Sequence, residues 1–506
     1  MILSPNPTSA PNGTATLSAR VARSAGWIFG ARLVMGLFGF LNTIIVARIL
    51  APEDFGVIAI GLTTMQILVN VSDIGVSQAV IRFRDASRAD LDTLFTLSAM
   101  RGVMIAVFLA AVAPFAAGFY DDRRVMFVFL GVALYPLLTG FINPRFYEFE
   151  RLLDFSKQFT VEVLNKIAGV IVSITVAVIF KTYWAILLGL ATTAAVHLAL
   201  SYQLRPYLPR FSLVSFRRIL GFSGWLTGVG LMAALNNKLD SLILARVIGV
   251  TGAGHFFMGL QLAELPTREI AYPATRALYP GLAELQENPP RANQAFLLGV
   301  EAMAAIATPA AIGFAFIAGD FIHVLLGEKW REAAPVIQII APVMGLQMPL
   351  VATQYFAMAL GSTRFVFLRE LVFFFIRTPV FLWAALAHGL LGAALAVALC
   401  GVIHIILNLG LYARISGESM ARPVWRVRRS VSASIAMAAG LIALHAVGFA
   451  ADWAPVIRLS VDILIGVILF GATHIALWSL ENRPDGVERL TLSFAQSMLR
   501  RRGARR

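Results

Sequence analysis

Long apolar stretches recur along the chain from Ser24 to Leu480, and short polar connections separate them. A helix of about 20 apolar residues is long enough to cross a hydrocarbon core about 30 Å thick. The pattern therefore predicts an all-α polytopic membrane protein with fourteen transmembrane helices and no long soluble insertion. The predicted spans are 24–48, 55–80, 93–116, 125–143, 159–180, 183–203, 219–245, 253–276, 295–320, 334–360, 365–387, 389–413, 431–450 and 456–479.

The composition agrees with a membrane protein. Of the 506 residues, 58% are hydrophobic and 14% are charged, whereas about 25% of a soluble globular protein is charged. This excludes an ordinary soluble enzyme. Residues 1–23 lack the short apolar region and cleavage site of a signal peptide, so we expect a disordered cytoplasmic tail. Cys400 is the single cysteine, which leaves no internal disulfide and no cysteine metal cluster, and we expect no cofactor.

The net charge of +14 is a topology signal. Basic residues gather in alternate connections, above all 204–218, 414–430 and the tail 481–506, and Arg364 and Arg369 are assigned to another of these connections. Cytoplasmic loops carry the excess of lysine and arginine, so we expect both termini in the cytoplasm and no nucleic-acid partner. Binding of the 414–430 loop or the tail to anionic membrane lipids stays open as a second role.

The sequence contains an internal repeat. A shift of 198 residues places GWIFGARLVMGLFGFLNTIIVARILAPEDFG, which begins at Gly26, over GWLTGVGLMAALNNKLDSLILARVIGVTGAG, which begins at Gly224. Leucines could match by chance, but tryptophan, arginine and several glycines in one register could hardly do so. The matched pairs are Gly26/Gly224, Trp27/Trp225, Gly30/Gly228, Ala47/Ala245, Arg48/Arg246, Gly56/Gly254 and Gly61/Gly259.

The repeat predicts the layout of the helices. Six predicted helices separate the two copies, an even number, so both copies cross the membrane in the same direction. We therefore expect a six-helix N-lobe (24–203), a basic linker (204–218) and a six-helix C-lobe (219–413), followed by a basic loop (414–430), two further helices (431–480) and a basic tail (481–506). Repeats of this kind place the substrate path between the lobes and alternate access by rocking one lobe against the other.

The residues also resemble a known family. The Gly-Trp start of the first repeat, its ending ARILAPEDFG and the following VSDIGVSQAVI are similar to the polysaccharide-transporter, or oligosaccharide flippase, branch of the MOP (multidrug/oligosaccharidyl-lipid/polysaccharide) superfamily, whose fold is MATE-like. The likeness in helix layout covers nearly the whole chain, and the likeness in residues is concentrated in 24–82.

This resemblance implies a function and a location. It implies a flippase in the bacterial cytoplasmic (inner) membrane that moves undecaprenyl-diphosphate-linked glycan units from the cytoplasmic to the periplasmic leaflet. The product would serve exopolysaccharide, capsule or O-antigen assembly. The implied partners are the lipid-linked oligosaccharide, membrane lipids, a polysaccharide polymerase with other assembly proteins, and a proton or sodium ion as the coupling ion.

A diphosphate-linked glycan requires positive charge and a polar cavity. A basic residue costs about 2.5–3.5 kcal/mol at the centre of a membrane helix, so basic residues within the spans are expected to face a cavity, a partner or the interface. The candidate residues of the cavity, basic and polar together, are Arg32, Asn42, Gln66, Arg101, Asn237, Lys238, Asp240, Glu264, Arg268, Tyr272, Arg276 and Arg377.

Several candidates have a second interpretation. Arg32 shares a helical face with Gly36 and Thr43, which suits a cavity wall or close helix packing. Arg101 could instead extend to the cytoplasmic interface. Glu264 and Arg268 are four residues apart and could neutralise each other.

The seventh and eighth helices are the most polar. The outer half of the seventh carries the run from Asn236 to Ser241, and the eighth carries a stripe from Glu264 to Arg276 at four-residue spacing. Pro266 interrupts that helix, as a second proline does further along, and proline bends a helix by freeing backbone carbonyls. We expect a gate and a phosphate site there, and a kinked helix with an internal salt bridge is the alternative.

Other functions remain open. A cation-coupled multidrug exporter of the same superfamily should favour acidic sites, and here acids and bases are mixed. A lipid II flippase is expected to carry additional arginines in its first helix, where this chain has uncharged Asn42. A scaffold for glycosyltransferases is the non-transport alternative. The predicted outer connections are short and no nucleotide-binding or nucleophile motif is present, so we expect no enzyme.

The corner VARILAPEDFG joins the first two predicted helices. The second copy of the repeat keeps the alanine, the arginine and the final glycine but lacks the Pro-Glu-Asp run, which argues against a catalytic role for Glu53 and Asp54. We expect Asp54 to cap the second helix. Arg48 and Arg246 are expected to lie at equivalent helix ends and to bind the carbonyl groups there.

Overall fold

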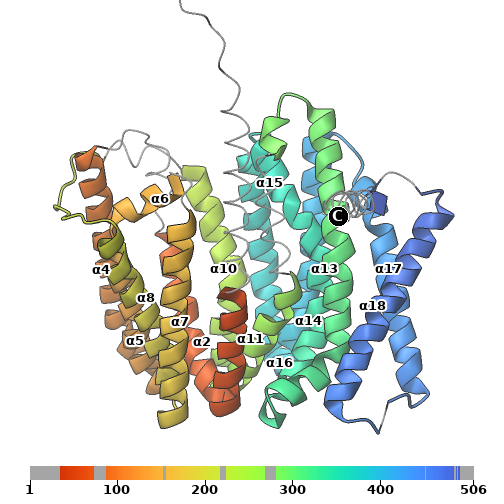
Figure 1. Ribbon diagram of the computed structural model, residues 1–506, viewed down its shortest axis with the longest axis horizontal. Helices are drawn as coiled ribbons and strands as arrows, with labels where there is room; N and C mark the ends of the chain where they lie inside the picture. The colour runs from red at the N-terminus through yellow and green to blue at the C-terminus, as the bar shows by residue number, and fades with distance from the viewer. Residues whose placement is uncertain are drawn as a thin grey trace, which may run out of the picture. The chain divides into compact units, whose positions relative to one another are not determined.

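The structure is a computed structural model that describes residues 35–72, 87–151, 155–216, 224–267, 278, 281–450, 452–483, 486 and 488–489. Every regular element within these ranges is a helix (Figure 1). The predicted N-terminal tail and the start of the repeat lie outside the described residues. The same is true of the candidate residues Arg32, Arg268, Tyr272 and Arg276.

The chain divides into two compact units by its internal contacts. The first comprises Met1–Val46, Ser72–Phe115 and Met126–Phe222, and the second comprises Ala47–Val71, Ala116–Val125 and Ser223–Arg506. Helix α2 (Pro52–Val71) therefore belongs to the second unit, although the repeat places it in the N-lobe. The lobe boundaries taken from the repeat stay a prediction.

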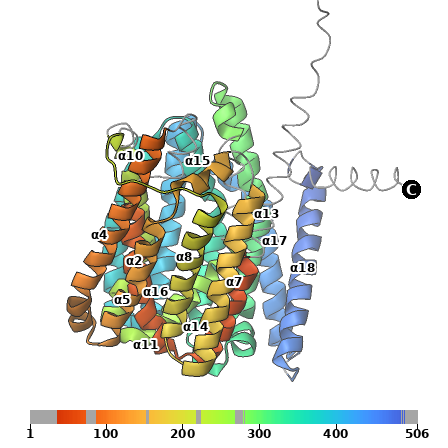
Figure 2. The same ribbon diagram turned by 60° about the vertical axis from the view of Figure 1, so that its left-hand side comes forward.

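Glycines bring the helices of the first unit close together. A Cβ on Gly189 would lie 2.9 Å from the carbonyl oxygen of Gly169, where the last two helices of this unit pack side by side (Figure 2). A Cβ on Gly140 would lie 3.1 Å from the Cα of Gly102. Small residues at such contacts are typical of membrane helices. The elements are most of α4 (Arg88–Tyr120) and α5 (Arg124–Gly140), then η1 (Pro144–Tyr147), α6 (Glu148–Arg151), α7 (Phe155–Phe180) and α8 (Trp184–Leu204).

The second unit is built around stacked aromatic rings. The ring of Phe296 stacks on Phe356 at 4.8 Å between centroids and on Tyr412 at 5.2 Å, and all three side chains are buried. Besides α2, the elements are α10 (Gly224–Val247), α11 (Gly249–Ala263), α13 (Pro289–Leu325), η2 (Glu328–Trp330), α14 (Ala333–Gln347), η3 (Met348–Val351), α15 (Ala352–Ala359), α16 (Thr363–Ser416), α17 (Ala421–Ala446) and α18 (Pro455–Leu480).

Helix α16 contains two predicted spans that meet at a break. Gly389 has φ 60° and ψ −135° inside the 54-residue helix, a conformation that only glycine adopts readily. The sequence predicts one span that ends at residue 387 and another that begins at residue 389. The backbone break lies at that boundary.

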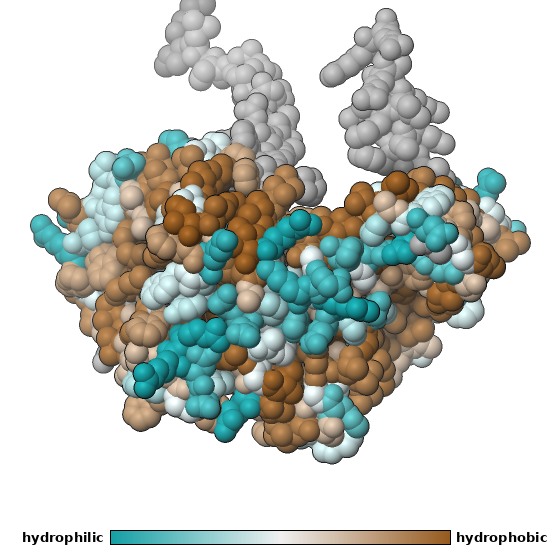
Figure 3. All heavy atoms as spheres, turned by 90° about the horizontal axis from the view of Figure 1, so that it is seen from below, coloured by the Kyte–Doolittle hydropathy of each residue, from teal (hydrophilic) through white to brown (hydrophobic). Residues whose placement is uncertain are grey.

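The surface is that of a membrane protein. Among the described residues, nine helices are long and apolar enough to cross a membrane, and Met35–Ile49 and Arg124–Gly140 are shorter apolar helices. Val467 and Leu464 on α18 are 65% and 60% exposed, as expected for a helix that faces lipid. Figure 3 shows hydrophilic residues gathered on the face seen from below, with hydrophobic residues around them. The chain is a multi-pass helical membrane protein, and the count of fourteen spans stays a prediction.

The break in α16 gives the first testable prediction. Gly389→Ala should lower the stability by about 1–3 kcal/mol, because alanine must adopt a strained positive φ. Crowding is not the cause, since the nearest atom to an added Cβ is 3.8 Å away. The melting temperature of the purified protein measures the effect. Gly471→Ala, with no atom within 4 Å of an added Cβ, should leave it unchanged or raise it, and equal behaviour of the two variants would contradict the prediction.

Candidate functional site

Asp240 and Arg377 form an ion pair between α10 and α16. Asp240 is buried, and the side chain of Arg377 is only 11% exposed. The guanidinium also lies 5.8 Å from the centroid of the Phe373 ring. Two candidates that are 137 residues apart in the sequence therefore meet inside the second unit.

A second polar cluster lies beside this pair. The side-chain amide of Asn236 donates to the Glu370 carboxylate over 2.8 Å, and Glu370 forms an ion pair with its neighbour Arg369. Arg369 also donates to Asn408 and, over 3.3 Å, to Gln354. Except for Gln354, these side chains belong to buried residues. Both charges are thus neutralised and hydrogen-bonded inside the protein.

Helical spacing explains why these side chains converge. Asn236 and Asp240 are four residues apart on α10, and Glu370 and Arg377 are seven apart on α16, so each pair lies on one helical face. A face that carries unpaired charge is expensive in an apolar environment. Packing the two faces together pairs the charges. We name these four residues, together with Arg369 and Asn408, the α10–α16 polar network.

Arg369 corrects the sequence analysis, which assigned it to a polar connection. Helix α16 begins at Thr363, and the Arg369 side chain is 5% exposed. Its place inside the predicted span 365–387 was a signal that this charge lies within a helix. Glu370 and Asn408 were not among the candidate residues either. A basic residue of the network was therefore absent from the candidate set.

The other candidates are more dispersed. The Nε of Arg101 donates to the hydroxyl of Ser72 over 3.1 Å. The Oδ1 of Asn42 is buried and has no hydrogen-bond partner within the part of the chain that the structure describes. A role in a cavity stays a prediction for Arg101, for Asn42 and for the remaining candidates of this group. The half-buried candidates are Asn42, Gln66, Arg101, Lys238 and Glu264, and the side chain of Asn237 lies outside the described residues.

Helices α2 and α11 cross at a pair of glycines that the repeat relates. A Cβ on Gly56 would overlap the carbonyl group of Val250, and a Cβ on Gly254 would overlap the carbonyl group of Pro52. The shift of 198 residues that relates Gly56 to Gly254 also relates Pro52 to Val250. The contact is therefore pseudo-symmetric, in the same sense as an isologous contact between two subunits. Both copies of the repeat keep a glycine because the helix backbones touch there.

The Pro-Glu-Asp corner begins α2 as expected. The backbone N–H of Ala51 donates to the Asp54 carboxylate over 3.2 Å, which confirms Asp54 as a capping residue. Arg124 lies 3.7 Å from Glu53, 3.9 Å from Asp54 and 2.8 Å from Asp122. Burial by itself would raise the pKa of Asp122, but its hydrogen bonds from Arg124 outweigh burial and lower the pKa. The acids thus form a structural charge cluster.

Arg48 binds carbonyl groups of another helix, which corrects the expectation that it binds its own helix end. Its Nε donates to the carbonyl oxygen of Leu325 over 2.7 Å, at the end of α13. In return, the Nζ of Lys329 donates to the carbonyl of Leu50 over 2.7 Å. The indole N–H of Trp330 donates to the carbonyl of Ala47 over 2.8 Å. Arg48 therefore caps α13, and the η2 residues that follow α13 cap the end of helix Met35–Ile49.

Arg246, the repeat partner of Arg48, also reaches the end of a different helix. Its guanidinium lies 5.4 Å from the centroid of the Phe119 ring, at the end of α4. The neighbouring Tyr120 donates to the carbonyl of Leu242 over 3.3 Å. The two arginines thus have equivalent positions, with a carbonyl cap in one copy and an aromatic contact in the other.

Residues 45–335 match the model of a family described as "Polysaccharide biosynthesis protein", and this range is more than half of the chain. The chain belongs to this family. The resemblance inferred from the first repeat and the PEDFG corner is confirmed.

Relatives in this polysaccharide biosynthesis family align over most of their length. Over 405 residues the chain is 24% identical to the lipopolysaccharide biosynthesis protein WzxC of Escherichia coli (strain K12), with 78% of this chain and 81% of that protein covered. Over 343 residues it is 25% identical to the succinoglycan biosynthesis transport protein ExoT of Rhizobium meliloti (strain 1021), with 66% of this chain and 69% of that protein covered.

Solved structures share the fold of this family member. A structure described as lipid II flippase MurJ in an inward closed conformation matches with a TM-score of 0.68 and 12% identity, covering 90% of this chain and all of that chain. An inward-facing multidrug resistance MATE family transporter of the MOP superfamily matches with a TM-score of 0.57 and 14% identity. This match covers 76% of this chain and 95% of that chain. At these identities the likeness establishes a MOP-type fold and nothing about the substrate.

The ion pair between α10 and α16 gives the second prediction. Arg377→Gln leaves the Asp240 carboxylate buried without its partner, which should cost about 3–5 kcal/mol of stability. The double variant Asp240→Asn/Arg377→Gln should recover most of the loss, because no unpaired charge remains. Thermal unfolding of the purified protein measures both. Arg331→Gln, at a side chain that is 83% exposed, is the control, and a single variant as stable as this control would contradict the assignment.

Proposed function

We propose that the protein is a flippase for a lipid-linked oligosaccharide, with undecaprenyl diphosphate as the lipid carrier. The observation that carries this proposal is the α10–α16 polar network, which places arginines and buried amides between two helices of an apolar member of the polysaccharide biosynthesis family. The relatives named for lipopolysaccharide biosynthesis and for succinoglycan transport support a glycan cargo. The product would enter exopolysaccharide, capsule or O-antigen assembly, with a polymerase as the next partner.

The chemistry of the network suits such a cargo. A diphosphate can compete with the Asp240 carboxylate for the guanidinium of Arg377, because arginine binds both groups with the same pair of donors. Amides such as Asn236 and Asn408 can donate to and accept from sugar hydroxyls. The candidates Lys238 and Arg268 would extend the positive surface along the path. The ion pair that stabilises the empty protein would therefore be exchanged for a substrate contact.

The proposed layout has fourteen spans in two six-helix lobes (24–203 and 219–413), joined by the linker 204–218 and followed by the helices of 431–480. The protein would lie in the inner membrane with both termini in the cytoplasm. A proton or a sodium ion would supply the driving force. The basic connections and the parallel repeat support this arrangement.

Alternating access is proposed to open and close the contact between α2 and α11. In the proposed lobes this contact joins the two halves of the chain, together with the mutual caps of Arg48, Lys329 and Trp330. Glycine contacts leave no side chain that must be moved aside, so two packed helices can separate as rigid rods. The contact would be the closed periplasmic side, and it would separate when the substrate is released.

Reconstituted transport is the direct test. We expect proteoliposomes containing the purified protein to move a fluorescent undecaprenyl-diphosphate oligosaccharide across the bilayer, which a membrane-impermeant quencher can follow. Asp240→Asn/Arg377→Gln should slow the movement by about tenfold or more, since loss of a charged hydrogen bond costs about 1.5–3 kcal/mol. Arg331→Gln should not change it. Absence of movement by the folded wild type, or exchange of a cationic drug instead, would refute the proposal.

The α2–α11 contact can be tested separately. Gly56→Leu should hold the two helices apart and expose the face that they cover. A cysteine introduced at Val57, which is fully buried, in a Cys400→Ala background should then react with a membrane-impermeant maleimide. Gly471→Leu is the matched control, because nothing surrounds that position. Equal labelling with and without Gly56→Leu would argue against a closed contact there.

A further inference from the structure

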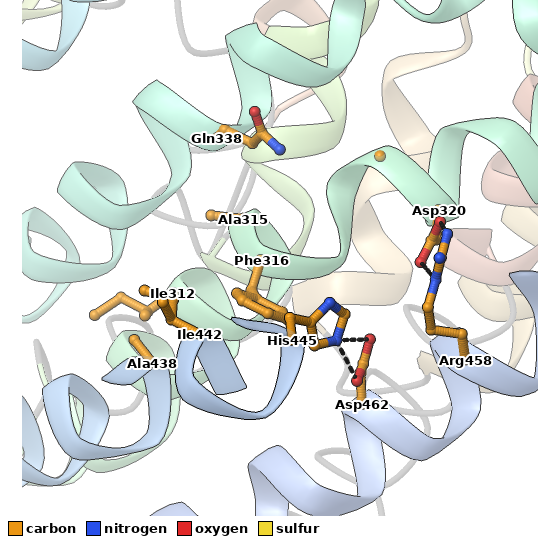
Figure 4. Close-up of a pocket in the computed structure, with 11 residues that line it drawn as sticks. Ile312, Ala315, Phe316, Asp320, Gln338, Ala438, Ile442, His445, Arg458 and Asp462 are labelled. Atoms are coloured by element: carbon orange, nitrogen blue, oxygen red, sulfur yellow. Dashed lines mark hydrogen bonds and ion pairs between the residues drawn. The ribbon is translucent and has the colours of Figure 1, made fainter. Parts of the chain in front are cut away.

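A pocket lies where α13, α14, α17 and α18 come together (Figure 4). Its volume of about 600 Å³ is in the range of small-molecule sites. It is lined by both charged and apolar side chains, and it is separate from the α10–α16 polar network. The lining residues are Ile312, Ala315, Phe316, Gly319, Asp320, Gln338, Ala438, Ile442, His445, Arg458 and Asp462.

The Arg458–Asp320 ion pair and a contact between His445 and Asp462 lie on one side of this pocket. The Nε of Arg458 donates to the Asp320 carboxylate over 2.6 Å, and a second guanidinium nitrogen binds the other carboxylate oxygen. The Nε2 of His445 lies 3.0 Å and 3.2 Å from the two oxygens of Asp462. Asp462 is only 3% exposed, and one imidazole nitrogen satisfies few of the sites at which a carboxylate can accept. The pocket wall thus has capacity for a further hydrogen-bond donor.

The charges and the apolar side chains are ordered by depth along the helices. Asp320, His445 and Arg458 lie within about a turn and a half of the ends of α13, α17 and α18. Ile312 and Ala438 lie about two turns deeper than Asp320 and His445, at a rise of about 1.5 Å per residue. Figure 4 shows Ile312, Ala438 and Ile442 on the side opposite Arg458. The pocket therefore has a charged end near the membrane boundary and an apolar end toward the bilayer centre.

We propose that this pocket binds an ordinary membrane phospholipid whose headgroup carries a phosphate and a primary ammonium. The phosphate binds the guanidinium of Arg458, which offers a planar pair of donors. The ammonium donates to the Asp462 carboxylate, and the first part of an acyl chain lies against Ile312, Ala438 and Ile442. The charged headgroup thus lies at the charged end of the pocket, and the acyl chain lies at its apolar end.

The charge balance favours this lipid over the proposed transport substrate. The pocket has two carboxyl groups, Asp320 and Asp462, beside the single guanidinium of Arg458, and His445 is charged only when it is protonated. A zwitterionic headgroup matches such a site, because each of its charges meets the opposite charge. A diphosphate brings two negative charges and would leave both carboxylates facing an anion. An anionic phospholipid without an ammonium would leave Asp462 without its additional donor.

A bound lipid has a structural role at this position. Only Asp462, Gly466 and Trp478 are buried among the described residues of α18, so this helix has few deeply packed side chains. A lipid that contacts both α13 and α18 adds contacts between the last two helices and the rest of the second unit. We expect the lipid to stabilise the attachment of α17 and α18.

The test compares the lipids that remain bound to the full-length protein. The protein is reconstituted in nanodiscs made of equimolar phosphatidylethanolamine and phosphatidylglycerol, extracted in mild detergent, and analysed by native mass spectrometry. The wild type should retain phosphatidylethanolamine in preference to phosphatidylglycerol. Ala438→Phe fills the apolar end and should reduce the retained phosphatidylethanolamine by about tenfold, which corresponds to about 1.4 kcal/mol of binding free energy. Ala439→Phe, on the exposed side of the same helix, should retain it as the wild type does.

A second pair of variants tests the charged end. Asp462→Asn should abolish the preference for the ammonium headgroup, whereas Asp452→Asn, in the exposed connection before α18, should keep it. Addition of phosphatidylethanolamine should raise the melting temperature of the wild type and not that of Ala438→Phe. Three outcomes would overturn the proposal. They are bound lipid of the same composition as the nanodisc, equal retention by Ala438→Phe and Ala439→Phe, or recovery of a polyprenyl diphosphate from the pocket in place of the phospholipid.

Discussion

A charged side chain inside a bilayer needs a partner within the protein, and this requirement holds α10 and α16 together. Asp240 and Arg377 neutralise each other, and Arg369, Glu370, Asn236 and Asn408 satisfy one another beside them. Apolar packing between membrane helices is weakly specific, because lipid tails offer similar contacts. The polar contacts therefore define which faces of these helices meet. In the proposed function, a ligand with phosphate groups would replace the Asp240 carboxylate at Arg377.

The internal repeat gives a second principle of construction. Its two copies meet through α2 and α11, where Gly56 contacts the backbone near Gly254 and the relation holds in both directions. A side chain at either position would separate the helices, which is why both copies have glycine. Arg48 and Arg246, which are a matched pair within the repeat, contact the ends of α13 and α4. The pseudo-symmetry is thus close in the backbone contacts and looser in the side chains around them.

The polysaccharide biosynthesis family and the MOP-type fold give different kinds of information. The family match covers residues 45–335, which include α2, α10, α11 and all of α13 but not the residues of α16. The network arginines Arg369 and Arg377 lie beyond that range, so the match does not explain them. Their explanation is physical, because α10 brings acidic and amide groups that need basic partners. The proposed lipid pocket is built by α13, which lies inside the family match, and by residues of α14, α17 and α18 that lie outside it.

The sequence by itself determined the membrane class, the faces of individual helices, the repeat and the capping role of Asp54. These properties are local, since helical rise and periodicity fix which residues share a face. Only the tertiary structure decided that Asp240 pairs with Arg377, that Arg369 is buried in the network, and that Arg48 caps α13. Such pairs join residues that are 137 and 277 positions apart. Their contact depends on how whole helices pack, because many charged faces could in principle satisfy one another and only the packed chain selects one combination.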